Sequence, residues 1–182
     1  MRRRTLGLSL LATALGGLSA SSGAADRPNV LVIVSDDHGL ELGCYGHPVL
    51  KTPHLDRLAA EGTRFRNAFC TTASCSASRS VLLTGLHNHA NGQYGHQHSV
   101  HHFSAFGTVK SLPVILAEHG YRTARVGKYH VAPESVFAFQ TKIPAPGGAR
   151  HTVRMAEACR EFVADRSSPF FLYYATADPH RG

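Results

Sequence analysis

Apolar runs separated by glycine, proline and polar clusters predict alternating strands and helices along this chain. The run from Asn29 to Val34 is continuous and rich in β-branched residues, without the alternation of a strand that has one face in water. We therefore expect a parallel strand that is buried on both faces. Further strands are expected at residues 64–69, 123–126 and 169–175.

Helical periodicity and capping signals predict helices between these strands. Thr52-Pro53 is a helix start, and Gly62 ends that helix. Further helices are expected at residues 76–86, 111–120 and 154–166. The order β, α, β, α, α, β, α, β is typical of an α/β fold with a parallel or mixed sheet and helices on both faces.

Polar clusters follow three of the predicted strands. They are Asp36 and Asp37, Lys128 and His130, and Asp178 and His180. Because the carboxyl ends of parallel strands share one edge of a sheet, we expect the three clusters to converge there. Two carboxylates are hard donors that suit Ca²⁺ or Mg²⁺, although adjacent acids are often only solvated. In an extended segment Lys128 and His130 point to the same side and suit an anionic substrate; two surface polar residues are the alternative.

Cysteine and histidine supply the other candidate groups. Cys75 opens a predicted helix, and Arg79 lies one turn later on the same face, which indicates an anion site with a reactive thiol; an inert buried cysteine is the alternative. No CxxC pair occurs, so a structural zinc site is not expected. A histidine tract resembles a metal-binding tract but lacks a fixed ligand spacing with a partner Cys or Glu, so it is weak evidence for a metal, and a substrate-facing loop or a solvent loop fits it equally well. Its members are His96, His98, His101 and His102.

Composition and the N-terminus narrow the class of protein. With 43% apolar and 17% charged residues, the chain is no disordered tail or collagen-like fibre.

The N-terminus predicts an export signal at residues 1–25, read by the Sec or the twin-arginine route. It has a basic start at residues 1–4, an apolar run at 6–20 and small residues up to Ala25. The mature chain is then expected in the periplasm or secreted, without stable membrane insertion. Its 16 basic and 12 acidic residues leave a net charge of +4, and no basic run indicates nucleic-acid binding.

Four segments resemble, in the right order, those of the type I sulfatases, a family of the alkaline-phosphatase-like superfamily. The signature Cys75-Ser-Ala-Ser-Arg79 with Leu83-Thr-Gly85 is joined by segments 29–37, 52–62 and 127–130. The resemblance covers residues 28–182 and implies that superfamily's mostly parallel sheet with helices on both faces. Within the family, further segments are most similar to the sulfamidases, which cleave N-linked sulfate from glucosamine. These segments are 101–103, 111–113, 127–134 and 178–181.

The resemblance implies a role for each matching residue. Asp36 and Asp37 would bind Ca²⁺ together with residue 75. Cys75, oxidised to formylglycine and hydrated, would supply the hydroxyl that attacks sulfur. The remaining roles are charge stabilisation by Arg79 and Lys128, proton removal by His130, protonation of the leaving group by His180, and substrate binding by Lys128, His180 and Arg181.

Two departures from the family pattern affect these expectations. Ala77 stands where the commoner signature has proline, which puts the efficiency of cysteine oxidation in question. The family's further metal ligands, an Asp–Asn pair, have no counterpart, so we expect residues 26–182 to be the N-terminal part of a sulfatase catalytic domain that is inactive and folds poorly alone. Expected partners are a sulfated glycan and a formylglycine-generating enzyme, and a homodimer is compatible with the resemblance. A phosphonate or phosphate ester hydrolase and a non-catalytic anion- or glycan-binding relative are the alternatives.

Overall fold

The computed structural model describes residues 27–181, so the predicted export signal lies outside the described residues. Within this range the strands are β1 (Val30–Asp36), β2 (Arg122–Gly127), β3 (Thr141–Lys142) and β4 (Phe170–Pro179). The helices are α1 (Pro53–Glu61), α2 (Cys75–Thr84), α3 (Asn88–Asn91), α4 (Leu112–Glu118), α5 (Thr152–Ala158) and α6 (Arg160–Ala164), with a short 3-10 helix η1 (Gly43–Tyr45). None of the described helices is long and apolar enough to cross a bilayer.

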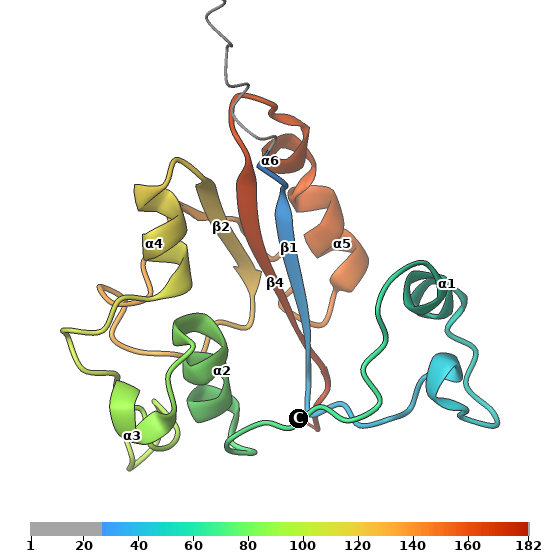
Figure 1. Ribbon diagram of the computed structural model, residues 1–182, viewed down its shortest axis with the longest axis horizontal. Helices are drawn as coiled ribbons and strands as arrows, with labels where there is room; N and C mark the ends of the chain where they lie inside the picture. Colours follow the sequence, from blue (N-terminus) through green and yellow to red (C-terminus); the bar gives the residue numbers. More distant parts are fainter. Residues whose placement is uncertain (1–26, 182) are drawn as a thin grey trace, which may run out of the picture.

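The described strands form one parallel sheet in the order β1-β4-β2-β3. The last strand in sequence, β4, therefore lies between β1 and β2. Figure 1 shows α2 and α4 on one side of the sheet and α5 and α6 on the other. This arrangement confirms the α/β fold with a parallel sheet and helices on both faces.

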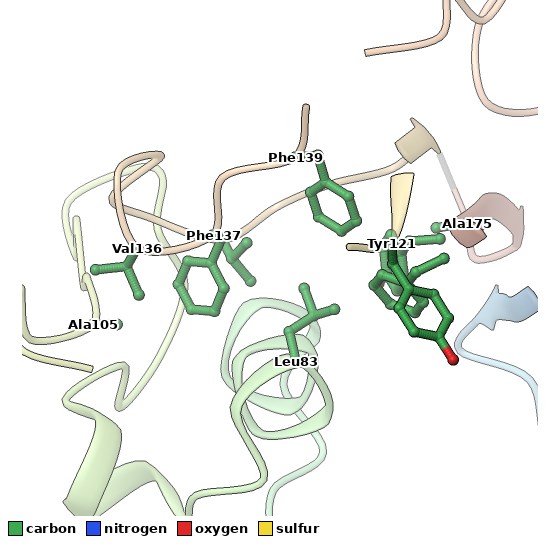
Figure 2. Packing of buried hydrophobic residues seen from close by; sticks show 10 residues of the cluster. Leu83, Ala105, Tyr121, Val136, Phe137, Phe139 and Ala175 are labelled. Carbon is green, nitrogen blue, oxygen red and sulfur yellow. The ribbon is translucent and has the colours of Figure 1, made fainter. Parts of the chain in front are cut away.

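Alternation along the central strand β4 divides the core in two. Phe171 and Tyr173 belong to a cluster that includes Leu83 of α2. Figure 2 shows Leu83 extending from its helix toward the neighbouring aromatic rings of that cluster. Phe170 and Leu172 belong to the second cluster, which lies under α5. Both faces of β4 are thus buried, as a continuous apolar run predicts.

The strand β1 differs from the prediction on one of its faces. Val32 and its even-numbered neighbours pack against the first cluster, but Leu31 and Ile33 are 52% and 61% exposed. The expectation of burial on both faces is therefore wrong within residues 27–181. The reason is position, because β1 is the edge strand of the described sheet, whereas the second core cluster contains residues of β2 and β4 but none of β1.

Two further predicted elements are corrected. The described residues 64–69 form no strand, because this segment pairs with η1 and not with the sheet: the Tyr45 hydroxyl donates to the Phe65 carbonyl oxygen at 2.9 Å, and the Arg64 guanidinium donates to the Cys44 carbonyl oxygen. The predicted helix 154–166 is two short helices that meet at Cys159 (φ −81°, ψ −8°).

Candidate active site

The carboxyl ends of β1, β2 and β4 bring three of the predicted polar clusters to one place. In Figure 1, β1 and β4 end together at the bottom of the view, near the chain's C-terminus. Asp36 is in register with Pro179, the residue before His180, and Lys128 follows β2 directly. The Lys128 ammonium reaches across the end of β4 to form an ion pair with Asp36. The structure therefore brings together groups from residues 36, 128 and 180.

Asp36 is buried and is held by two cations. Its Oδ1 accepts a hydrogen bond from Arg79 Nη2 at 2.9 Å, and its Oδ2 pairs with Lys128 Nζ. Burial alone would raise the pKa of Asp36, but the hydrogen bonds and positive charges of Lys128 and Arg79 outweigh it, so the pKa lies below its usual value. Asp36 is accordingly a carboxylate at neutral pH.

Arg79 is the most buried cation of the site. It lies on α2, one turn after Cys75, and its Nη1 donates to the Tyr173 hydroxyl at 2.9 Å and to the Lys128 carbonyl oxygen at 3.0 Å. These bonds fix the guanidinium against the sheet edge. Sequence reasoning missed Tyr173, which looked like one more apolar residue of a buried strand; the only signal was that a buried tyrosine hydroxyl needs a partner.

Cys75 is the first residue of α2, at the positive end of the helix. It is half-buried and lines a pocket of about 400 Å³ together with Asp36, Asp37, Cys70 and Arg79. Asp37 is exposed, and its φ of 59° turns the chain just after β1. Both predicted acids thus border one pocket with the predicted nucleophile. All four cysteines lie within the described residues and are free.

His180 completes a tight group of potential ligands. One donor atom each from Asp36, Cys75 and His180 lies within 4.8 Å of the other two. The His180 carbonyl oxygen accepts a hydrogen bond from Arg150 Nη2 at 2.8 Å, and Arg150 also pairs with Asp178. Sequence reasoning missed Arg150. Arg181 is exposed and does not line the pocket of Cys75 in the described residues.

His130 is half-buried beside this network. Its φ is 58°, so the expectation of an extended segment from Lys128 is wrong at this residue. Burial, followed by the positive charge of Lys128 and then by His98 and His96, lowers the pKa of His130 to about 4. The imidazole is therefore neutral at neutral pH and can accept a proton.

Two members of the histidine tract pack against His130. The rings of His98 and His130 are stacked with centroids 4.6 Å apart and planes 7° apart, and His96 is stacked at 5.7 Å from His130. The sequence left a substrate-facing loop and a solvent loop open for this tract. The structure places His96 and His98 next to the candidate base, whereas His101 and His102 are exposed.

Comparison with known proteins decides which family has this arrangement. A family model described as Sulfatase matches residues 28–182. The chain belongs to the sulfatase family. Human N-sulphoglucosamine sulphohydrolase is 45% identical to this sulfatase-family chain over 162 residues, which are 85% of the chain and 32% of the human protein. An ulvan-active sulfatase from Formosa agariphila is 30% identical over 167 residues, 90% of the chain and 32% of the relative.

A solved structure agrees with this assignment. A protein in complex with its substrate D-glucosamine-2-N,6-O-disulfate has a TM-score of 0.71 and 27% identity to the sulfatase-family chain, covering 86% of it and 35% of the solved chain. The chain thus spans about a third of the length of these three relatives.

Proposed function

We propose that this chain forms part of the active site of an enzyme that hydrolyses sulfuric esters or sulfamates, with N-sulfated glucosamine or a related sulfated glycan as the substrate. The observation that carries the proposal is the ionised Asp36 between Arg79 and Lys128, beside Cys75 and His180 at one sheet edge. The 45% identity to human N-sulphoglucosamine sulphohydrolase supports the choice of substrate.

The donor groups fit a hard cation once residue 75 carries oxygen. Asp36 and Asp37 offer anionic oxygens at one pocket, which are the ligands that Ca²⁺ prefers, whereas the Cys75 thiol is a soft donor. We therefore propose that Asp36 and Asp37 hold Ca²⁺ together with an oxygen of a formylglycine made from Cys75. When bound, Ca²⁺ would act as a Lewis acid on the oxygen groups around it. The hydrated formylglycine would supply the hydroxyl that attacks sulfur.

Arg79 and Lys128 would supply positive charge to the site. Arg79, fixed by Asp36 and Tyr173, keeps a positive charge next to residue 75 without needing to reorganise. Lys128 is less buried than Arg79, and its ammonium can donate hydrogen bonds to Asp36 and to a sulfate oxygen at the same time. Both cations would stabilise the negative charge that builds up on the sulfuryl oxygens.

Two histidines would transfer protons in different steps of the reaction. The neutral imidazole of His130 would accept the proton of the second hydroxyl at residue 75, which expels sulfate and restores the aldehyde. His180, whose donor nitrogen lies near Cys75, would give a proton to the leaving amine or alcohol. Arg181, which is exposed, would contact the glycan outside the pocket.

The remaining proposals concern the partners. Conversion of Cys75 requires a formylglycine-generating or equivalent enzyme, and we propose that this happens on the route of export through the predicted signal at residues 1–25. A homodimer is compatible with the family resemblance.

The test is hydrolysis by the protein that contains this chain, produced in its native host. We expect release of sulfate from N-sulfoglucosamine, with a loss on the order of a thousandfold or more in Cys75→Ala. Cys70→Ser is the matched control, because Cys70 lines the same pocket but has no proposed role, and it should keep activity. Mass spectrometry of the tryptic peptide 67–79 should show the aldehyde at Cys75 and a thiol at Cys70.

The same assay separates the alternatives. Preferential hydrolysis of a phosphonate monoester or phosphate diester would favour the second enzyme class. Glycan binding that persists in Cys75→Ala, with an unmodified thiol and no turnover in the parent protein, would favour a binding protein and refute the proposed function.

A further inference from the structure

Three imidazoles form a second group of potential ligands, separate from Asp36, Cys75 and His180. His96, His98 and His130 each offer a ring nitrogen, and the three nitrogens lie within 4.8 Å of one another. They come from two segments far apart in sequence, the loop after α3 and the turn after β2. Such convergence is not produced by the sequence spacing of the tract alone.

Hydrogen bonds hold these two segments together. The His96 carbonyl oxygen accepts from the Phe103 backbone N–H at 3.0 Å, which closes the histidine loop. The Gln97 backbone N–H donates to Ser76 Oγ at 3.2 Å, and the Ala132 backbone N–H donates to the Gln93 side-chain oxygen at 3.4 Å. The loop is therefore anchored both to the start of α2 and to the segment that carries His130.

Within residues 27–181, two of the three histidines have a ring nitrogen without a partner. The Nδ1 atoms of His96 and His130 are buried and have no hydrogen-bond partner among the described residues. A buried polar atom without a partner is costly, and a bound metal ion would remove that cost. His98 is exposed, which gives an ion access from solvent.

Imidazole is a ligand for zinc and its neighbours among the transition metals, and three histidines with an open fourth position form a known type of zinc site. Tetrahedral ligands at a Zn–N distance of about 2.1 Å are roughly 3.4 Å apart. The three rings are stacked, so they would have to turn out of the stack until their nitrogens face one ion. Lys128 and Arg79 both place positive charge near His130. Asp36 neutralises one of these two charges, so a metal ion would bind here against a residual positive charge.

We propose that His96, His98 and His130 bind a transition-metal ion of the Zn²⁺ class at a site distinct from the Asp36 and Asp37 pocket. A bound metal ion would occupy a nitrogen of His130, so that this nitrogen could no longer accept a proton. The ion would therefore inhibit hydrolysis. The inhibition rests on the proposed function, whereas the binding does not.

The experiment is calorimetric titration with ZnCl₂, and Co²⁺ absorption spectroscopy, of the protein freed of transition metals and kept in Ca²⁺. We expect one Zn²⁺ per chain and a visible Co²⁺ spectrum typical of tetrahedral nitrogen ligation. His98→Asn should weaken Zn²⁺ binding at least about tenfold, since it removes one of three ligands. His102→Asn, an exposed histidine of the same loop, is the matched control and should bind as the parent does.

Activity supplies the second measurement. Each protein is compared with its own rate in the absence of Zn²⁺, because His98 also contacts His130. Added Zn²⁺ should lower the rate of the parent, whereas His98→Asn should keep its own zinc-free rate. Absence of saturable Zn²⁺ binding, or equal binding by His98→Asn and the parent, would overturn the site. Binding that leaves turnover unchanged would overturn the inhibition. A parent that binds Zn²⁺ but never hydrolyses sulfate would contradict the proposed function and leave the metal site supported.

Discussion

Replacing Gly127 with alanine tests how the turn after β2 positions the site. Gly127 has a φ of +82°, a conformation that residues with a Cβ adopt only at a cost. A Cβ there would lie closer than 3.0 Å to the Ala175 carbonyl oxygen of β4 and 2.6 Å from Met155 Cε. That same carbonyl oxygen accepts the Lys128 backbone N–H at 2.8 Å, so relief of the clash must disturb the residue that pairs with Asp36.

The magnitude follows from two contributions. The left-handed conformation costs an alanine roughly 1–2 kcal/mol. Forcing a methyl group against backbone in a packed core adds roughly 1–3 kcal/mol, because a carbonyl in the central strand cannot rotate away as a side chain could. We expect Gly127→Ala to lower the free energy of unfolding by roughly 2–5 kcal/mol, a large part of the stability of an ordinary domain.

Gly148→Ala separates the two contributions. Gly148 has a φ of +98°, and a Cβ there meets nothing within 4 Å, so this variant should lose only the conformational part, roughly 1–2 kcal/mol. The assay is urea unfolding of the parent and both variants, followed by circular dichroism. Equal losses in the two variants would refute the argument that Gly127 is required for close approach to β4. Gly127→Ala should also lose activity under conditions where it is folded.

Three further predictions follow from buried groups. Tyr173→Phe removes a hydroxyl that accepts from Arg79, and we expect a loss of roughly 1–2 kcal/mol in urea unfolding; an unchanged midpoint would contradict this bond. Met155→Ala should cost roughly 2–5 kcal/mol because Met155 is fully buried, whereas the exposed Val153→Ala should stay within about 0.5 kcal/mol. The pKa of His130 is about 4 in the folded chain against 6.5 in an unfolded one. The contribution of His130 to the free energy of unfolding is therefore fully present above pH 6.5 and decreases as the pH falls toward 4, because the unfolded state takes up the proton first. Unfolding of the parent and His130→Asn at pH 7 and pH 5, without transition metals, should show the parent's relative stability decreasing at pH 5; an increase would refute the direction of the shift.

Local rules marked the candidate residues, and the family resemblance assigned their roles. A strand end followed by polar residues, as at Asp36, can be recognised within a few positions. A cysteine at a helix start with an arginine one turn later, as at Cys75 and Arg79, is equally local. Parallel pairing then requires that the carboxyl ends of neighbouring strands share an edge, which is why convergence could be expected without knowing the strand order.

The contacts between these residues were not predictable, because they depend on that order. An apolar run says that a strand is buried but not which strand is at the edge, so the exposure of Leu31 and Ile33 could not be foreseen. The bond from Arg79 to Tyr173 joins residues 94 positions apart and exists only because an odd-numbered residue of β4 faces α2. The stacking of His98 on His130 likewise depends on how a loop is anchored.

The position of β4 links the fold to the chemistry. β1 and β2 carry Asp36 and Lys128 but do not pair with each other, because β4 lies between them. The geometry of the ion pair between Asp36 and Lys128 therefore depends on the insertion of β4 between strands more than 85 residues apart in sequence. β4 also supplies the Tyr173 hydroxyl to Arg79, and the chain just after it supplies His180. Before that insertion Asp36 lacks this route to Lys128, and His180 is not held near Cys75. The site is thus a product of sheet completion, and a substitution that weakens β4 insertion, such as Gly127→Ala, should reduce activity although Gly127 itself has no proposed contact with the substrate.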